Sequence, residues 1–367
     1  MHANAEEFDV AIIGLGPAGA TAARLLSPAL RVIALDKKIS GDETAFTKPC
    51  GGLLAPDAQK ALSRFNLTLP KDILVDPQIF AVRTIDLEND LLRCYQRFYM
   101  NLDRRKFDEW LISLIPDSVE VVAGAHVSEL RRGFVHEAVR GGFVVTYEVG
   151  GEVRTITAKR IIGADGSYSV VRRKLFPKSK IARFTSIQEW FAEEHSMPFY
   201  SCIFDSSITP SYCWSISKDG HFILGGAFPT KDARRRFDLL KSKLTQRGFM
   251  FGKPEKTEAC QVSMLRSWSD FCVGVDGAFL IGEAAGFISP SSLEGISYAL
   301  DSAVAVATAI NTFGADANRR YARKTAAIRR KLMTKHVKSQ FMYRPLLRKL
   351  VMKIGLDAIE VDTGNAK

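Results

Sequence analysis

The sequence has few of the features that mark disulfide-rich, metal-binding or membrane-spanning proteins. Its six cysteines, at positions 50, 94, 202, 213, 260 and 272, form no Cys-x-x-Cys pair and no metal-type spacing with the six histidines. No uninterrupted apolar run reaches the roughly 18 residues that a spanning helix needs, and segment 296–313 is interrupted by Asp301. The polar segment 1–7 does not resemble a secretory signal. We therefore expect a reduced, cytoplasmic protein with no metal site.

The chain also lacks internal repeats, low-complexity tracts and long linkers. Its 367 residues are enough for one large or two ordinary domains with a substantial core. The net charge is +11, but no recognised nucleic-acid-binding motif accompanies it, so we expect no nucleic-acid partner.

The positive charge is concentrated near the C-terminus. Thirteen Lys and Arg residues but a single acid, Asp357, lie between positions 317 and 358, so this segment accounts for the whole positive excess of the chain. Apolar residues are interleaved with the basic ones, partly at helical spacing. Two interpretations stay open: residues 317–356 contact an anionic membrane surface peripherally, or they form helices whose apolar face packs on the main body.

A glycine-rich turn near the N-terminus predicts a dinucleotide site. Segment 8–13 is typical of a buried parallel strand, and the alanine-rich segment 18–27 is typical of the helix that follows such a strand. Gly14 would permit the tight turn, Gly16 the close approach of a pyrophosphate, and Gly19 the packing of helix on strand. The helix N-terminus would then offer N–H groups and a partial positive charge to the phosphates.

A second predicted strand, residues 31–35, ends at Asp36, whose carboxylate would accept hydrogen bonds from a ribose. Further along the chain, Gly163-Ala-Asp-Gly166 follows another apolar stretch. On its own this segment is equally typical of an ordinary turn at the end of a strand.

Four motifs spread over nearly the whole chain carry a family resemblance. They are Gly14-x-Gly16-x-x-Gly19 with Asp36; Asp103-Arg104-x-x-Phe107-Asp108-x-x-Leu111; Gly163-Ala-Asp-Gly166 with Ser169 and Arg172; and Gly282-Glu-Ala-Ala-Gly286 with Pro290 and Glu294-Gly-Ile296. In this order they resemble the FAD-dependent oxidoreductases with the fold of p-hydroxybenzoate hydroxylase. Within these, the chain is most similar to the geranylgeranyl reductase group, which includes the bacterial CbrA-like proteins.

The resemblance implies a single FAD held by both ends of the chain. A helix that begins near Gly295 would stabilise negative charge on the flavin ring. The chain departs from the family at Asp36, where relatives more often carry Glu, and at Glu283, where most carry Asp. The residues that the resemblance assigns to the cofactor are Gly14, Gly16, Pro17, Ala18, Gly19, Asp36, Lys37, Cys50, Gly51, Arg104, Asp165, Gly166, Gly282, Glu283, Gly286, Pro290, Gly295 and Ile296.

Cys50-Gly51-Gly52 resembles the segment that lies beside the flavin in prenyl reductases. There, Cys50 would be the catalytic residue that delivers a proton, and the glycines, Gly52 included, would leave room for a flat alkene; alternatively, Cys50 is a small buried hydrophobe. Tyr212-Cys-Trp214 resembles part of the reductases' substrate-channel motif, but the Phe-Pro that should follow is absent at that position. The two aromatic residues therefore line an apolar substrate chamber or belong to the core of a sheet.

The predicted fold is α/β (α+β overall), with a Rossmann-type FAD-binding domain and an interleaved antiparallel substrate-binding sheet. We assign residues 1–70, 102–180 and 270–313 to the FAD-binding domain, 71–101 and 181–269 to the substrate domain, and 314–367 to a basic helical C-terminal region.

The resemblance implies an FAD-dependent oxidoreductase that reduces carbon–carbon double bonds in an isoprenoid or lipid-like, apolar substrate. NAD(P)H or a ferredoxin would supply the electrons. The alternatives are an FAD-dependent monooxygenase acting on an aromatic or polyketide-like compound, and a flavin-binding scaffold without turnover.

Overall fold

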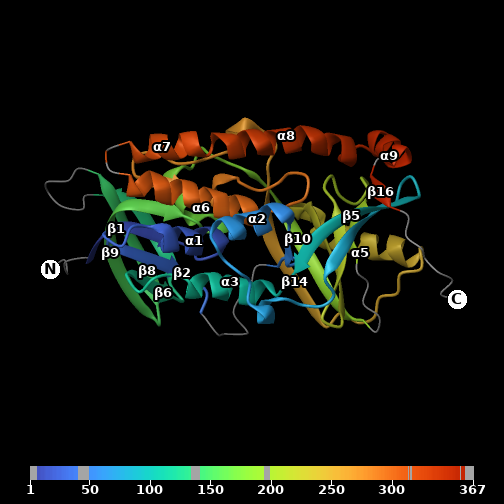
Figure 1. Cartoon of the computed structure of the whole chain (residues 1–367), viewed down its shortest axis with the longest axis horizontal. Helices are drawn as coiled ribbons and strands as arrows, with labels where there is room; N and C mark the ends of the chain where they lie inside the picture. The colour runs from blue at the N-terminus through green and yellow to red at the C-terminus, as the bar shows by residue number, and fades with distance from the viewer. Residues whose placement is uncertain are drawn as a thin grey trace.

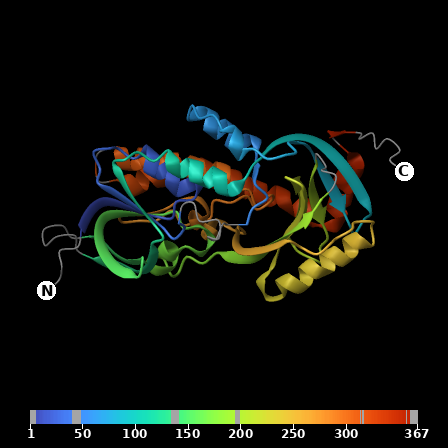
Figure 2. The same cartoon turned by 90° about the horizontal axis from the view of Figure 1, so that it is seen from below.

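The computed structural model describes residues 6–39, 49–133, 141–193, 199–312, 314, 316–355 and 357–359. Two sheets lie at opposite ends of the long axis, and helices connect and cover them (Figures 1 and 2). The predicted mixed α/β class with a Rossmann-type sheet is confirmed.

The first sheet has seven strands in the order β6-β2-β1-β9-β8-β7, and β15 also pairs with β9. Strands β6, β2, β1, β9 and β15 pair in parallel, whereas β7, β8 and β9 form an antiparallel meander. The strand bounds are β1 Glu6–Ile13, β2 Val32–Asp36, β6 Val119–Ala123, β7 His126–Gly133, β8 Gly142–Val149, β9 Glu152–Gly163 and β15 Ala278–Leu280.

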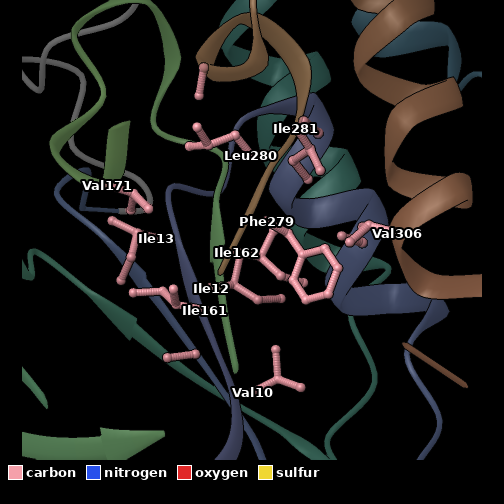
Figure 3. Packing of buried hydrophobic residues seen from close by; sticks show 14 of the residues in the cluster. Val10, Ile12, Ile13, Ile161, Ile162, Val171, Phe279, Leu280, Ile281 and Val306 are labelled. Atoms are coloured by element: carbon pink, nitrogen blue, oxygen red, sulfur yellow. The ribbon is translucent and has the colours of Figure 1, made fainter. Parts of the chain in front are cut away.

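Helices α1 (Pro17–Leu25), α3 (Arg104–Ser113) and α6 (Ile296–Asn311) pack near this sheet, and α1 contacts both α3 and α6. Figure 3 shows apolar side chains of β1, β9 and β15 packed together with Val306 of α6. Helix α6 is buried along most of its length, in agreement with its apolar sequence. Two further helices are α2 (Pro56–Arg64) and α4 (Val170–Leu175).

The second sheet has nine strands in the order β14-β10-β13-β12-β11-β4-β5-β16, and β3 also pairs with β5. Helix α5 (Ala233–Thr245) packs on β10 and β13. The strand bounds are β3 Leu53–Leu54, β4 Ile79–Asp86, β5 Leu91–Asn101, β10 Ala182–Ala192, β11 Phe199–Phe204, β12 Cys213–Lys218, β13 His221–Pro229, β14 Lys256–Met264 and β16 Ala358–Ile359.

Three helices near the C-terminus extend along the molecule from the first sheet to the second (Figure 1): α7 (Ala317–Lys324), α8 (Ala326–Tyr343) and α9 (Pro345–Ile354). Tyr321 of α7 donates a hydrogen bond to the Leu280 carbonyl at 2.7 Å, and Leu332 of α8 is fully buried. After these helices, the short strand β16 pairs antiparallel with β5, where backbone groups at this edge of the second sheet find partners. Within the described ranges, none of the helices is long and apolar enough to cross a bilayer.

Candidate active site

The three glycines after β1 have different surroundings. Gly14 has φ +94°, and a Cβ there would lie 2.8 Å from the Ala164 carbonyl oxygen. A Cβ on Gly19 would collide with the Gly14 carbonyl oxygen, so both glycines are required by the packing of the chain itself. Gly16, by contrast, has no atom of the described part of the chain within 4 Å of its Cβ position, and it is the residue just before α1. Gly16 therefore borders open space at a helix N-terminus, which suits a phosphate-bearing ligand.

Three of the four motifs meet around this turn. Ala164, which crowds Gly14, belongs to the third motif, and a Cβ on Gly282 of the fourth would lie 3.0 Å from the Cβ of Ala18. The buried guanidinium of Arg172 donates to the Ala284 carbonyl at 3.1 Å and so ties the third motif to the fourth. The three segments directly follow the parallel strands β1, β9 and β15, whose carboxyl ends lie at one edge of the sheet. In open α/β sheets this edge is where ligands bind.

Asp36 lies at the end of β2 and is almost fully buried. One carboxylate oxygen accepts a short hydrogen bond from the Leu15 amide in the glycine-rich turn, and the other accepts the Lys38 amide at 2.8 Å. Asp36 therefore fixes the turn beside Gly16, while its predicted contact with a ribose stays a prediction. Lys37, also predicted to contact the cofactor, is exposed.

The second motif joins this site through ion pairs. The Asp108 carboxylate, one turn after the start of α3, lies 2.8 Å from Nε of Arg104 and 3.1 Å from Nζ of Lys38. Burial would raise the pKa of Asp108, but the two cations hold that pKa below its usual value. Burial would likewise lower the pKa of Arg104, but Asp108 and the thiol of Cys50, which is hydrogen-bonded to the guanidinium, raise it. Arg104 therefore links the dinucleotide turn to the Cys50 segment.

The acids of the third and fourth motifs are held by backbone amides. Asp165 accepts the Val170 amide at 2.6 Å, at the start of α4, and burial raises the pKa of its carboxyl. The other Asp165 oxygen is buried and has no hydrogen-bond partner among the described residues. Gly166 has φ +73°, and within the described ranges no atom lies within 4 Å of its Cβ position. Glu283 accepts the Ser263 amide of β14 at 2.8 Å, so the fourth motif also contacts the second sheet.

The loop before α6 contains backbone conformations with positive φ and leads into a helix at the predicted place. Gly286 has φ +85° and approaches the Asp270 carbonyl, while Leu293 has the unusual φ of +52°. The helix begins at Ile296, as predicted, with Gly295 as its N-cap. The nearest atom to a Cβ on Gly295 would be 4.0 Å away. The first-turn amides of α6 thus adjoin open space, where their partial positive charge favours an electron-rich group.

Tyrosine hydroxyls from other elements fix this loop. Tyr212, the residue just before β12, donates to the Ser292 carbonyl at 2.6 Å, and Tyr343 of α8 donates to the carbonyl of the buried Pro290 at 3.1 Å. Tyr200 donates to the Tyr212 oxygen at 3.0 Å, and Tyr99 of β5 donates to the Glu294 carboxylate at 3.2 Å. Burial raises the pKa of each of these four tyrosines, so their hydroxyls stay protonated.

Tyr212 and Trp214, predicted to contact substrate, are both buried in one apolar cluster with Ile288 and Leu293 of the loop. The two rings lie 5.8 Å apart, and the indole nitrogen of Trp214 has no hydrogen-bond partner among the described residues. The structure therefore places both aromatic residues in the sheet core and also against the loop before α6, so the two interpretations of this pair are compatible.

The Cys50 segment lies where α3, β5 and β12 meet. Lys218, at the end of β12, donates to the Gly51 carbonyl at 2.9 Å and to the Leu102 carbonyl at 2.8 Å. The ammonium group is buried, and burial lowers the pKa of Lys218 to about 8 although Cys50 opposes the shift. Cys50 thus interacts with Lys218 as well as with Arg104, and its Sγ also accepts the Gly52 amide at 3.5 Å.

The two glycines of this segment differ. Among the residues that the structure describes, no atom lies within 4 Å of a Cβ on Gly51, whereas a Cβ on Gly52 would collide with Lys218 and with the Leu102 carbonyl. Gly52 was predicted to make room for a substrate. The structure corrects this, because the space beside Gly52 is filled by protein and the open space lies at Gly51.

No protein-family model matches the chain. Among curated proteins, it is 51% identical over 351 residues to protein CbrA of Escherichia coli K12, which covers 96% of this chain and 98% of that protein. The chain belongs to the CbrA family.

Solved structures agree with the fold of this CbrA-family chain. A geranylgeranyl bacteriochlorophyll reductase-like protein from Thermoplasma acidophilum matches with a TM-score of 0.80 at 19% identity, covering 98% of this chain and 94% of the other. PqsL, a probable FAD-dependent monooxygenase from Pseudomonas aeruginosa, matches with a TM-score of 0.69 at 17% identity, covering 95% and 100%. The CbrA-family chain therefore has the fold of FAD-dependent oxidoreductases.

Sequence reasoning missed Lys218, Lys38 and Tyr343 in this CbrA-family site. A lysine followed by Asp219-Gly220 looks like an exposed residue before a turn. Yet every residue of β12 is buried, and at the strand end Lys218 contacts the carbonyls of Gly51 and Leu102. No local sequence pattern predicts the burial of Lys218, because it depends on how the two sheets are arranged.

Proposed function

We propose that this chain binds FAD along the carboxyl edge of the first sheet and reduces carbon–carbon double bonds of an isoprenoid or lipid-like substrate with it. The residues fit the cofactor, because Gly16, Gly51, Gly166 and Gly295 all border space that no atom of the described residues fills. Gly16 would face the pyrophosphate at the start of α1, and Gly295 with the first turn of α6 would face the flavin ring. The folds of the two solved neighbours support FAD.

The position of Cys50 carries the reductase proposal. When bound, reduced FAD supplies a hydride for one alkene carbon. The second carbon needs a proton, and the S–H bond of Cys50, next to the open space at Gly51, can provide it. The thiolate left behind lies beside the cations of Arg104 and Lys218, which offset its charge until solvent returns a proton.

The surroundings of the loop before α6 suit an apolar substrate. Tyr212, Trp214, Ile288 and Leu293 form one apolar cluster; the Tyr212 hydroxyl donates to a backbone carbonyl, and the Trp214 indole nitrogen has no partner among the described residues. No second dinucleotide fingerprint occurs in the sequence, so we propose that NAD(P)H binds transiently or that a ferredoxin delivers the electrons.

The test separates hydride transfer from oxygen chemistry. The protein is purified, its flavin content and identity are determined after denaturation, and the flavin is reduced under anaerobic conditions. Addition of polyprenyl substrates should then reoxidise the flavin without oxygen and yield a product heavier by two hydrogens. A flavin that reoxidises only in air, with an oxygen atom in the product, would refute the reductase proposal and leave FAD binding intact.

One observation favours a second candidate, an FAD-dependent monooxygenase. The hydroxyl groups of Tyr99, Tyr200 and Tyr212 form a polar row near Glu294, which would suit a substrate that carries a polar or aromatic group. The same anaerobic experiment decides between the two candidates.

A further inference from the structure

Helix α9 is oriented with its apolar face away from the protein. Its two buried residues, Arg348 and Met352, lie one turn apart on the inner side. The exposed fractions of Leu346, Leu350 and Ile354 are 81%, 58% and 59%, and these residues follow one another at four-residue spacing on the other side. With Val351, which is 40% exposed, they form what we call the α9 outer face. An ordinary surface helix buries such a stripe and exposes its arginine.

Ion pairing holds the helix in this orientation. The Arg348 guanidinium lies 2.8 Å from the carboxylate of Asp86 and 2.6 Å from that of Glu88, and it stacks over the Phe204 ring. On the inner side, Nε of Arg93 also donates to the Met352 carbonyl at 3.0 Å. These contacts cannot form if α9 turns to bury its leucines. The exposed apolar face is therefore part of the folded structure.

Basic side chains surround the outer face. Arg344, Lys349 and Lys353 belong to or adjoin α9, and no acid occurs between positions 317 and 356. Within the part of the chain that the structure describes, none of the three has an acidic partner within salt-bridge distance. At the end of α8, Phe341, which is 49% exposed, and the exposed Lys338 add a further apolar and a further basic side chain.

We propose that the α9 outer face and its basic surround dock on an anionic lipid surface. Leucine and isoleucine side chains would enter the boundary between headgroups and acyl chains, while the three cations remain with the lipid phosphates. A second copy of the chain is the poorer occupant. A two-fold contact through this face would place one basic surround against another, and repulsion between like charges disfavours such a dimer.

The docked face would lie close to the candidate active site. Tyr343, the last residue of α8, is adjacent to Arg344 and donates to the carbonyls of Pro290 and Ser291. The hydrogen bonds of Tyr343 thus connect the start of α9, which would contact the lipid, to the loop before α6. This inference does not depend on which reaction the site performs.

The experiment is co-flotation of the full-length protein with vesicles of phosphatidylcholine alone or mixed with phosphatidylglycerol, at low and high salt. One variant removes the apolar face (Leu346→Ser, Leu350→Ser, Ile354→Ser), and another removes the charge (Arg344→Gln, Lys349→Gln, Lys353→Gln). Two matched controls change other exposed residues in the same way: Val153→Ser, Leu239→Ser, Met250→Ser, and Lys174→Gln, Lys178→Gln, Lys180→Gln. Circular dichroism and the urea midpoint verify folding.

Wild type and both controls should float with anionic vesicles at low salt. Loss of three cations should weaken partitioning roughly a hundredfold, since each contributes about a fivefold effect near an anionic surface. Loss of the apolar face should weaken it by at least about tenfold in all vesicles. The proposal is overturned if the wild type does not bind anionic vesicles, or if both variants bind them as well as their controls do. It is also overturned if the wild type is a dimer that the apolar variant disrupts without any change in vesicle binding.

Discussion

Replacing Arg348 with methionine should release α9 from the second sheet. The side chains of Arg348 and Asp86 are 1% and 0% exposed, so the substitution leaves a fully buried carboxylate without its cation. Breaking a buried pair in this way costs about 3–5 kcal/mol, even though methionine can occupy most of the space of the arginine stem. Few other contacts oppose release, because the apolar side of α9 faces outward.

The expected magnitude is large for a local event. An energy of about 3–5 kcal/mol raises the population of the open helix by roughly two to three orders of magnitude. Limited trypsin digestion reports this population directly, because Lys349 and Lys353 become cleavable when α9 detaches. Arg348→Met together with Asp86→Asn should restore most of the protection, since the neutral amide no longer requires a cation. Arg348→Lys should restore little, because one ammonium cannot engage both oxygens of Asp86 and Glu88.

The pH dependence gives an independent check. Burial would raise the pKa of Asp86, but Arg348 and Asn89 hold that pKa below its usual value. In wild type this stabilisation is therefore complete above the unfolded pKa of about 4 and is lost as the pH falls below it. Without Arg348, burial dominates and the pKa of Asp86 rises, so acidification should reduce the difference between the variant and wild type. Equal cleavage rates at neutral pH, or a difference that grows in acid, would refute this account.

Three further predictions concern the candidate active site. Gly16→Ala should leave the urea midpoint nearly unchanged but lower the flavin content. Gly19→Ala should destabilise the protein itself, because of the two glycines only Gly19 is crowded by backbone. Similar effects of the two substitutions would contradict the assignment of Gly16 to the cofactor and of Gly19 to packing. Cys50→Ala should keep flavin but slow anaerobic reoxidation by substrate about a hundredfold or more, the usual contribution of a general acid, and an unchanged rate would exclude Cys50 as the proton donor. Lys218→Met should change stability little at neutral pH, because relief of the buried charge offsets the two lost hydrogen bonds. The pKa of Lys218 is about 8 in the folded protein, below its unfolded value of 10.5. The stability of wild type relative to Lys218→Met should therefore rise as the pH increases from about 8 to 10. A difference between the two urea midpoints that does not change with pH would disprove the burial of a charged lysine.

Much of the first sheet is predictable from local pattern. The turn at Gly14, the parallel strands around it and the start of α6 at Ile296 follow from hydrophobic runs and glycines whose roles are local. Local rules suffice here because each strand, turn and helix of a Rossmann unit adjoins the next one along the chain.

The second sheet and the C-terminal helices were less predictable for a physical reason. Arg348 and Asp86 are 262 residues apart, and Lys218 meets the Leu102 carbonyl across 116 residues. A buried charge of this kind looks like a surface charge in the sequence, because its partner is fixed by tertiary structure alone. The same holds for α9, whose composition indicated an amphipathic helix but not which side it would turn to the protein.

These long-range polar contacts share a location that bears on function. The apolar clusters belong mainly to one sheet or the other, whereas Lys218, Tyr99, Tyr212 and Tyr343 join the second sheet and α8 to segments that follow the first. Hydrogen bonds depend more sharply on geometry than apolar contacts do, so a small shift between the sheets would change these bonds first. Their acceptors include the carbonyl of Gly51 and that of Ser292 in the loop before α6. A shift between the two sheets, whatever causes it, is therefore expected to move the segments around the candidate cofactor site before it disturbs either core.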